Sequence, residues 1–272
     1  MTEIGPRETD RAGGAAEFVD IRGRGSKTTV VVFTGLAQRV GALPPFEFAR
    51  TMDSLGVNSV LLRDPNLSWY QSQIPGFGRT FLDKAYRIRE YIDQCGGSEV
   101  HFLGTSSGGF AALAYATVIP AVSVLTFGAQ TSIAPSRRAA FNDHRWPRLI
   151  ERANNAASGM FLDVAELGPL RVRRDATALF GTTEQVDLVH ALHAARFLGP
   201  SYVPVAVRGA GAEIGRESLP PAGGAVRGWW YHLRASGEAE RQGRPIPVPA
   251  ALTPADALTA GEGFRARGDT IV

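Results

Sequence analysis

Residues 100–116 have the sequence VHFLGTSSGGFAALAYA: an apolar segment, a turn rich in glycine and serine, and a run of small residues. The apolar segment predicts a buried strand, and the alanine-rich segment 109–119 predicts a helix. The turn between them has the pattern G-x-S-x-G, centred on Ser106. Glycine is required two residues to either side of the serine, because a Cβ there would collide with neighbouring elements. The segment therefore predicts a sharp strand–turn–helix unit that places Ser106 at the carboxyl edge of a sheet.

Apolar strands and helices alternate on both sides of this unit. Such an alternation is typical of a mostly parallel sheet with helices on both faces. The fold class that we predict is therefore α/β, with a doubly wound, mostly parallel sheet and a C-terminal appendage. We expect strands at 17–22, 28–33, 58–63, 100–103, 121–127, 176–180 and 203–207, and helices at 44–55, 81–95, 109–119, 186–197 and 225–234.

The composition predicts one main domain with loosely organised ends. Residues 1–16 have the composition of a flexible leader, and residues 17–235 carry the alternating pattern. Within them, 131–174 is less regular and fits an inserted cap over the sheet. Residues 236–272 are rich in glycine, proline and alanine and predict a tail with a short helix. The tail is where we expect a protein partner or a second copy of the chain to bind.

Composition also excludes several classes of protein. The chain has 272 residues, 44% hydrophobic and 20% charged, with a net charge of +3. Arginine supplies 27 of the 29 basic residues and is scattered, which argues against a nucleic-acid-binding face. A single cysteine, Cys95, excludes an internal disulfide and a cysteine metal cluster. Asp187, His190 and His193 could share a helix face, but no fixed third ligand is visible, so we expect no metal, and no cofactor is expected either. Without an apolar run of about 18 residues or a signal-like start, no membrane association is predicted and the expected location is cytoplasmic.

The serine turn resembles the nucleophile elbow of the α/β-hydrolase superfamily, and the resemblance covers most of residues 28–234. More narrowly, residues 104–112 are similar to the GxSxGGxAA elbow of small bacterial hydrolase-like proteins. The segments FTG, PPFEF and RDP…WY further upstream fit the same pattern. The resemblance implies that Ser106 is a nucleophile. It also implies an oxyanion hole built from the backbone N–H of Ser107 and the loop at Gly35 and Leu36.

The expected catalytic triad is incomplete. In this superfamily an acid follows the serine along the chain, and Asp187, after the strand 176–180, has that position. The triad histidine is expected near Ala212, where the sequence has none. His190 is our first choice for the base, because D-x-x-H spacing puts it one helical turn from Asp187. His232 and Glu213 are the alternatives, and loss of the base is the fourth possibility.

Two functions of different class remain open. The first is a serine hydrolase or acyltransferase that acts on an ester or thioester of a small metabolite or sugar, through an acyl-enzyme on Ser106. The second is a hydrolase-fold protein that has lost catalysis and serves as a binding or scaffold module. Trp69 and Tyr70 are candidates for the mouth of a substrate pocket, together with Gly35; packing over the sheet edge is the other interpretation of the two aromatic residues.

Overall fold

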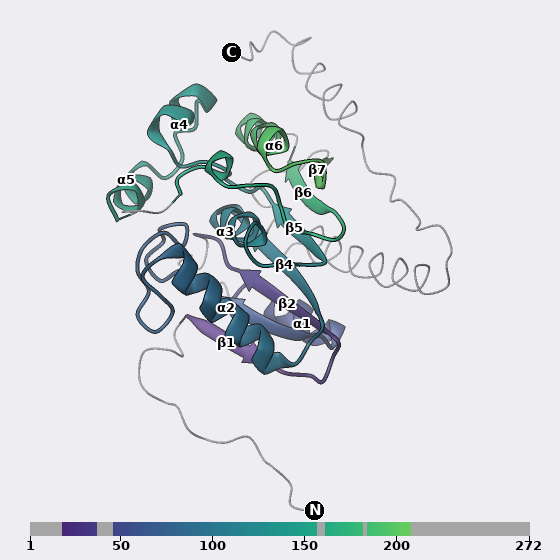
Figure 1. The fold of residues 1–272 in the computed structure, drawn as a ribbon. Helices are drawn as coiled ribbons and strands as arrows, with labels where there is room; N and C mark the ends of the chain where they lie inside the picture. Colours follow the sequence, from purple (N-terminus) through teal and green to yellow (C-terminus); the bar gives the residue numbers. More distant parts are fainter. Residues whose placement is uncertain (1–17, 37–45, 157–160, 182–183, 208–272) are drawn as a thin grey trace, which may run out of the picture.

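The computed structural model describes residues 18–36, 46–156, 161–181 and 184–207, coloured in Figure 1. One seven-stranded sheet with strand order β1-β3-β2-β4-β5-β6-β7 runs through these residues. Only β1 is antiparallel to its neighbour, so the predicted α/β class with a mostly parallel sheet is confirmed. The strands are β1 (Val19–Arg22), β2 (Thr28–Phe33), β3 (Asn58–Leu62), β4 (Glu99–Thr105), β5 (Ser123–Phe127), β6 (Ala176–Gly181) and β7 (Tyr202–Val207).

Helices cover both faces of the sheet (Figure 1). The helices are α1 (Ala49–Leu55), α2 (Phe81–Cys95), α3 (Ser106–Ala116), α4 (Pro135–Phe141), α5 (Pro147–Ala156) and α6 (Gln185–Phe197). On β2, Val31 and Phe33 pack in the core on the side of α2 and α3, whereas Val30 and Val32 pack against α1. Burial on both faces explains the continuous apolar run VVVF in this strand, because each buried large side chain contributes about 1.5–3 kcal/mol.

The boundaries of the two helices nearest the site differ from the prediction. Helix α1 begins at Ala49 instead of residue 44, because Phe48 adopts a left-handed conformation with φ 60° and the preceding residues turn. Helix α3 begins at Ser106, directly after β4, and not at residue 109. Helix α2 matches its pattern: a capping box of Thr80 and Asp83 starts it and left-handed Gly96 ends it.

The chain between β5 and β6 contains α4, α5 and the short 3-10 helix η3 (Val164–Glu166). A β-bridge joins Ser132, before α4, to Asp163, just before η3. Figure 1 shows α4 and α5 beyond the carboxyl ends of β4 and β5, on the same side as α6. The role of this segment as a cap stays a prediction. The leader, the predicted helix 225–234 and the tail lie outside the described residues.

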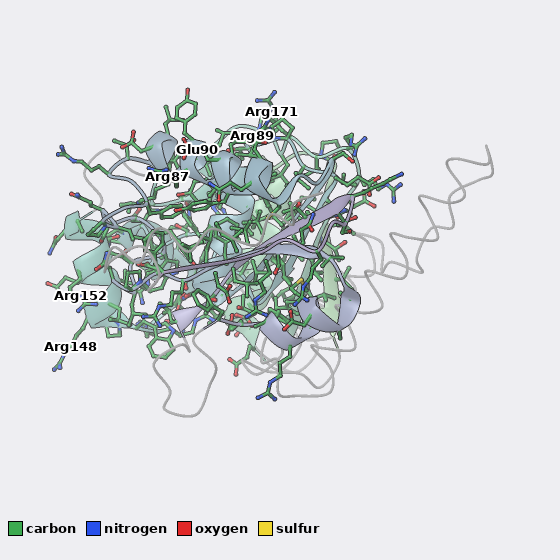
Figure 2. The ribbon with its side chains drawn as sticks, turned by 90° about the horizontal axis from the view of Figure 1, so that it is seen from below. Arg87, Arg89, Glu90, Arg148, Arg152 and Arg171 are labelled. Atoms are coloured by element: carbon green, nitrogen blue, oxygen red, sulfur yellow. The ribbon has the colours of Figure 1, made fainter. Side chains whose placement is uncertain are left out.

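The exposed arginines are distributed over separate elements. Figure 2 shows Arg87 and Arg89 on α2, Arg148 and Arg152 on α5, and Arg171 in the segment before β6, all pointing outward. None of the described helices combines the length and the apolar character that a membrane-spanning segment needs.

Candidate functional site

The turn between β4 and α3 has the predicted geometry. Ser106 is the first residue of α3 and has a strained left-handed φ of 49°. A Cβ on Gly104 would lie 2.3 Å from the carbonyl oxygen of Gly108, and one on Gly108 would lie 2.0 Å from that of Phe33. Only glycine fits at either position. The turn brings β4, α3 and β2 into contact, and the Ser106 side chain remains partly exposed at the carboxyl edge of the sheet.

The loop after β2 runs directly past Ser106. A Cβ on Gly35 would lie 3.5 Å from Cβ of Ser106 and 2.9 Å from the carbonyl oxygen of Thr105. The N–H of Gly35 donates to Oε2 of Glu47 at 3.0 Å, and the Thr105 hydroxyl donates to the same oxygen. Glu47 thus connects this loop to the serine turn. Glu47 belongs to the PPFEF segment, but its role could not be deduced from the sequence.

The backbone groups expected to bind an oxyanion lie around this junction. Leu36 is 7% exposed and follows Gly35, whose own N–H is already engaged with Glu47. Ser107 lies in the first turn of α3, where backbone N–H groups have no helical partner. The N–H groups of Leu36 and Ser107 therefore remain the two predicted donors, and this role stays a prediction.

Ser106 contacts an amide side chain that the sequence analysis did not identify. Its hydroxyl donates to Oε1 of Gln130 over 3.5 Å, a long hydrogen bond. Gln130 follows β5, the neighbour of β4, and is fully buried. Its Nε2 donates to Oδ2 of Asp143 over 3.4 Å. Gln130 therefore lies between the serine and a carboxylate.

Asp143 belongs to the loop between α4 and α5 and is surrounded by donors. Arg145 donates to its Oδ1 at 3.0 Å and to its Oδ2 at 3.2 Å, and Nε2 of His190 contacts Oδ2 at 3.0 Å. Burial opposes ionisation, but the hydrogen bonds from His190 and Arg145 outweigh it and hold the pKa of Asp143 well below its usual range. Asp143 is therefore a buried anion near neutral pH.

His190 lies on α6 with both ring nitrogens engaged. The backbone N–H of Thr131, which can only donate, points at Nδ1 over 3.1 Å. This assigns the ring proton to Nε2, which donates to Asp143. Burial lowers the pKa of His190, in agreement with a neutral ring. Ser106 and His190, both described, share no hydrogen bond; Gln130 and Asp143 lie between them. His190 as the base therefore stays a prediction that requires both of its ring hydrogen bonds to break.

Asp187 is buried on α6 three residues before His190, and its carboxylate is bound elsewhere. Nη1 of Arg145 donates to Oδ1 of Asp187 at 2.7 Å, so one guanidinium bridges Asp187 and Asp143. No hydrogen bond joins Asp187 to His190, two residues that the structure describes. The structure brings the predicted acid and base into one network, joined through Arg145 and Asp143 and not directly.

Trp69 and Tyr70 pack inside the protein. They are 0% and 1% exposed, and both have positive φ angles, 54° and 60°. The hydroxyl group of Tyr70 lies 3.0 Å from the carbonyl oxygen of Leu62 and 3.1 Å from that of Thr34, at the ends of β3 and β2. Of the two interpretations of these aromatic residues, the geometry agrees with packing at the sheet edge. Their role in substrate binding stays a prediction without a contact that supports it.

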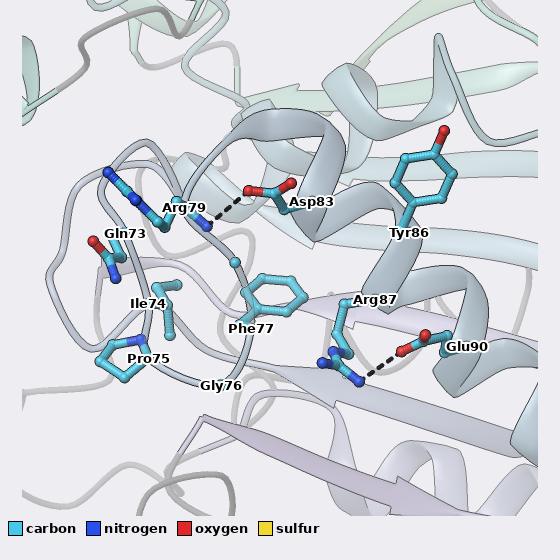
Figure 3. Close-up of a pocket in the computed structure, with 11 residues that line it drawn as sticks. Gln73, Ile74, Pro75, Gly76, Phe77, Arg79, Asp83, Tyr86, Arg87 and Glu90 are labelled. Atoms are coloured by element: carbon cyan, nitrogen blue, oxygen red, sulfur yellow. Dashed lines mark hydrogen bonds and ion pairs between the residues drawn. The ribbon is translucent and has the colours of Figure 1, made fainter.

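A cavity of about 440 Å³ lies elsewhere on the molecule (Figure 3). The loop from Gln73 to Arg79 and the outer face of α2 form its walls, and none of the residues around Ser106 lines it. Arg87 and Glu90, three residues apart on α2, form an ion pair of 2.6 Å along this wall. In the described part of the chain, no group of three or more histidine, cysteine, aspartate or glutamate side chains has the arrangement of a metal site.

Comparison with solved structures shows the class of fold. The chain is similar to MGS-MChE2, an α/β-hydrolase enzyme from the metagenome of lagoon sediments at Mar Chica, Morocco, with a TM-score of 0.54 and 17% identity over 79% of this chain and 95% of that one. It is also similar to MenH from S. aureus, with a TM-score of 0.55 and 11% sequence identity. This similarity covers 80% of this chain and 99% of MenH. A third similar structure is a monoacylglycerol lipase from Paleococcus ferrophilus, with a TM-score of 0.51 and 13% sequence identity. The similarity covers 78% of this chain and 97% of the lipase.

These similarities show that the protein has the α/β-hydrolase fold, as the serine turn predicted. No protein-family model matches the chain. No curated protein matches it in sequence either.

Proposed function

We propose that the protein cleaves or transfers an acyl group through a covalent ester on Ser106. The observation that carries this proposal is the strained φ of 49° at Ser106, on a turn where only glycine fits at two flanking positions. Such strain costs about 1–3 kcal/mol and is typical of functional sites. Phe48, Trp69 and Tyr70 have similar φ angles but are buried, whereas Ser106 combines the strained conformation with a partly exposed hydroxyl at the carboxyl edge of the sheet.

In the proposed reaction, Oγ of Ser106 forms a bond to the carbonyl carbon of an ester or thioester. The bond from that carbon to the alcohol or thiol breaks, and the proton of Ser106 ends on the leaving group. Water or a second alcohol then releases the acyl group from the serine. The N–H groups of Leu36 and Ser107 stabilise the oxyanion, helped by the partial positive charge at the N-terminus of α3. A small metabolite or an acylated sugar is the substrate class that we propose.

The origin of the base determines how active such a site is. His190, supported by Asp187, is the base that the sequence analysis proposes, whereas His232 and Glu213 lie outside the described residues. The alternative function, a binding module without catalysis, is favoured by one specific observation. Ser106 contacts an amide rather than an imidazole, and an amide does not accept a proton at neutral pH.

A fluorophosphonate probe distinguishes the two functions, because it phosphonylates an activated serine far faster than an ordinary one. We expect the folded protein to be labelled and Ser106→Ala to be unlabelled. Ser136→Ala, which removes an exposed serine on α4, is the matched control and should be labelled like the wild type. A folded wild-type protein that stays unlabelled across the pH range would overturn the proposed enzyme and support the binding module.

A further inference from the structure

We infer that Gln130 and Asp143 are positioning residues of the Ser106 site, and that Gln130 occupies the place of the imidazole in a Ser–His–Asp triad. The inference rests on the proposed nucleophile Ser106 and adds two residues to it. Three side chains from three different parts of the chain meet in the order serine, amide, carboxylate, with separations of 3.5 and 3.4 Å. In a triad, the middle group likewise contacts the serine with one polar atom and the acid with another.

Thr131 and Asp143 determine which group donates in each hydrogen bond between Ser106 and His190. The N–H of Thr131 donates to Nδ1 of His190, so Nε2 of His190 donates to Asp143. Asp143 is ionised and accepts only, so the amide of Gln130 must turn its NH₂ group toward Asp143. Its oxygen then faces Ser106 and accepts the hydroxyl hydrogen. The resting serine is therefore a neutral hydroxyl held in one orientation.

This arrangement orients Ser106 but supplies no base to it. With no base in contact with Ser106 among the described residues, the proton of Ser106 leaves to hydroxide from solvent while Oγ attacks the probe, the P–F bond breaks and fluoride departs. The labelling rate should then rise about tenfold for each pH unit, because it follows the hydroxide concentration. An imidazole at position 130 would instead accept the proton directly, and Asp143 would stabilise the imidazolium.

The decisive variant is Gln130→His. Its labelling rate at about pH 7.5 should exceed that of the wild type by about 10²-fold or more. The rate should level off above the pKa of the new imidazole, near its ordinary value of about 6.5. The nearby carboxylates of Asp143 and Asp187 would raise this pKa, and the guanidinium of Arg145 would lower it. Two further titratable groups lie close by: neutral His190 on the far side of Asp143, and Glu47 on the far side of the serine turn. Gln130→Met, which has no polar atom there, should keep the wild-type pH dependence.

A second substitution tests whether the faster labelling of Gln130→His depends on Asp143, as it would in a triad. Adding Asp143→Asn to Gln130→His should remove most of the increase, because the asparagine cannot stabilise an imidazolium. A merely structural role of Gln130 would change the melting temperature of these variants but not the shape of their pH profiles. The wild-type pH profile tests the inference even if a variant fails to fold.

The outcomes distinguish this inference from the proposed function. A labelled wild type with a faster Gln130→His variant supports both. A labelled wild type whose rate already levels off near pH 6.5, or a folded Gln130→His variant that is no faster, overturns the inference and leaves the nucleophile Ser106 intact. An unlabelled wild type with a labelled Gln130→His variant supports the inference and overturns the enzyme. Absence of labelling in both overturns both.

Discussion

The carboxylate of Glu47 accepts a hydrogen bond from the hydroxyl of Thr105, the residue directly before Ser106. The same oxygen accepts the N–H of Gly35 at 3.0 Å, and the N–H of Glu47 donates to Thr34 at 3.3 Å. One buried side chain therefore fixes the distance between the loop after β2 and the serine turn. That distance sets the separation between Ser106 and the donors proposed for the oxyanion.

Glu47→Ala should weaken both the fold and the reactivity of Ser106. It leaves a buried N–H and a buried hydroxyl without their acceptor, which costs about 1–3 kcal/mol of the free energy of unfolding. The loop is then free to shift, and a displacement on the order of 1 Å lowers the labelling rate by about 10- to 100-fold. Urea unfolding and fluorophosphonate labelling measure the two effects.

Glu47→Gln is the matched control for this prediction, since its amide oxygen can still accept both hydrogen bonds. It should lose less stability and less reactivity than Glu47→Ala. If the alanine variant is as stable and as reactive as the wild type, Glu47 does not determine the geometry of this junction.

Gly108→Ala tests the packing of the serine turn. The new Cβ would lie 2.0 Å from the carbonyl oxygen of Phe33, and backbone on both sides must move to admit it. We expect a loss of about 3 kcal/mol or more in the free energy of unfolding. Gly23→Ala is the control: nothing lies within 4 Å of its Cβ, so its urea midpoint should stay at the wild-type value. Equal midpoints for the two variants would refute the close approach of α3 and β2.

The parts predicted from the sequence are those that local burial determines. Strands β2 and β3 were predicted within a residue of their ends, because a strand buried on both faces carries a continuous apolar run, VVVF in β2 and VLL in β3. The serine turn was predicted because only glycine fits beside it. Helix α1 was predicted to begin too early, since nothing in its apolar spacing indicates the left-handed turn at Phe48.

The polar network around Ser106 was not predicted, for a different physical reason. Gln130, Asp143 and Arg145 belong to an irregular segment in which no periodicity indicates which side chains face inward. Their contacts depend on where α4 and α5 pack against α6, a tertiary relationship between distant segments. The three-residue spacing of Asp187 and His190 indicated a shared helix face, but not that Arg145 and Asp143 would be their partners.

Lys84 gives the fold a dependence on pH that is measurable. Its ammonium group is fully buried and donates to the carbonyl oxygens of Tyr70 and Ser72, both at 2.7 Å. Burial lowers its pKa from 10.5 to about 8. Between these two values the folded state binds fewer protons than the unfolded state, so stability due to Lys84 rises with pH.

The measurement is urea unfolding of the wild type and Lys84→Met between about pH 7 and pH 10. The wild type should gain about 1–3 kcal/mol relative to the variant over this interval, as the cost of the buried charge disappears. Lys27→Met, which removes the exposed lysine, should follow the wild type throughout. A constant difference between wild type and Lys84→Met would mean that the buried ammonium keeps its proton in this range.

His190→Ala separates a positioning role of His190 from the role of a base. The side chain is fully buried, and its loss leaves the N–H of Thr131 without an acceptor and Asp143 without one of its donors. We expect a loss of about 2–4 kcal/mol in the free energy of unfolding. The labelling rate for each folded molecule should stay within about tenfold of the wild type, because the ring nitrogens do not face Ser106. His190→Gln, which can still donate to Asp143, should recover part of the lost stability. A folded His190→Ala protein whose labelling falls by about 10²- to 10⁴-fold would instead establish His190 as the base.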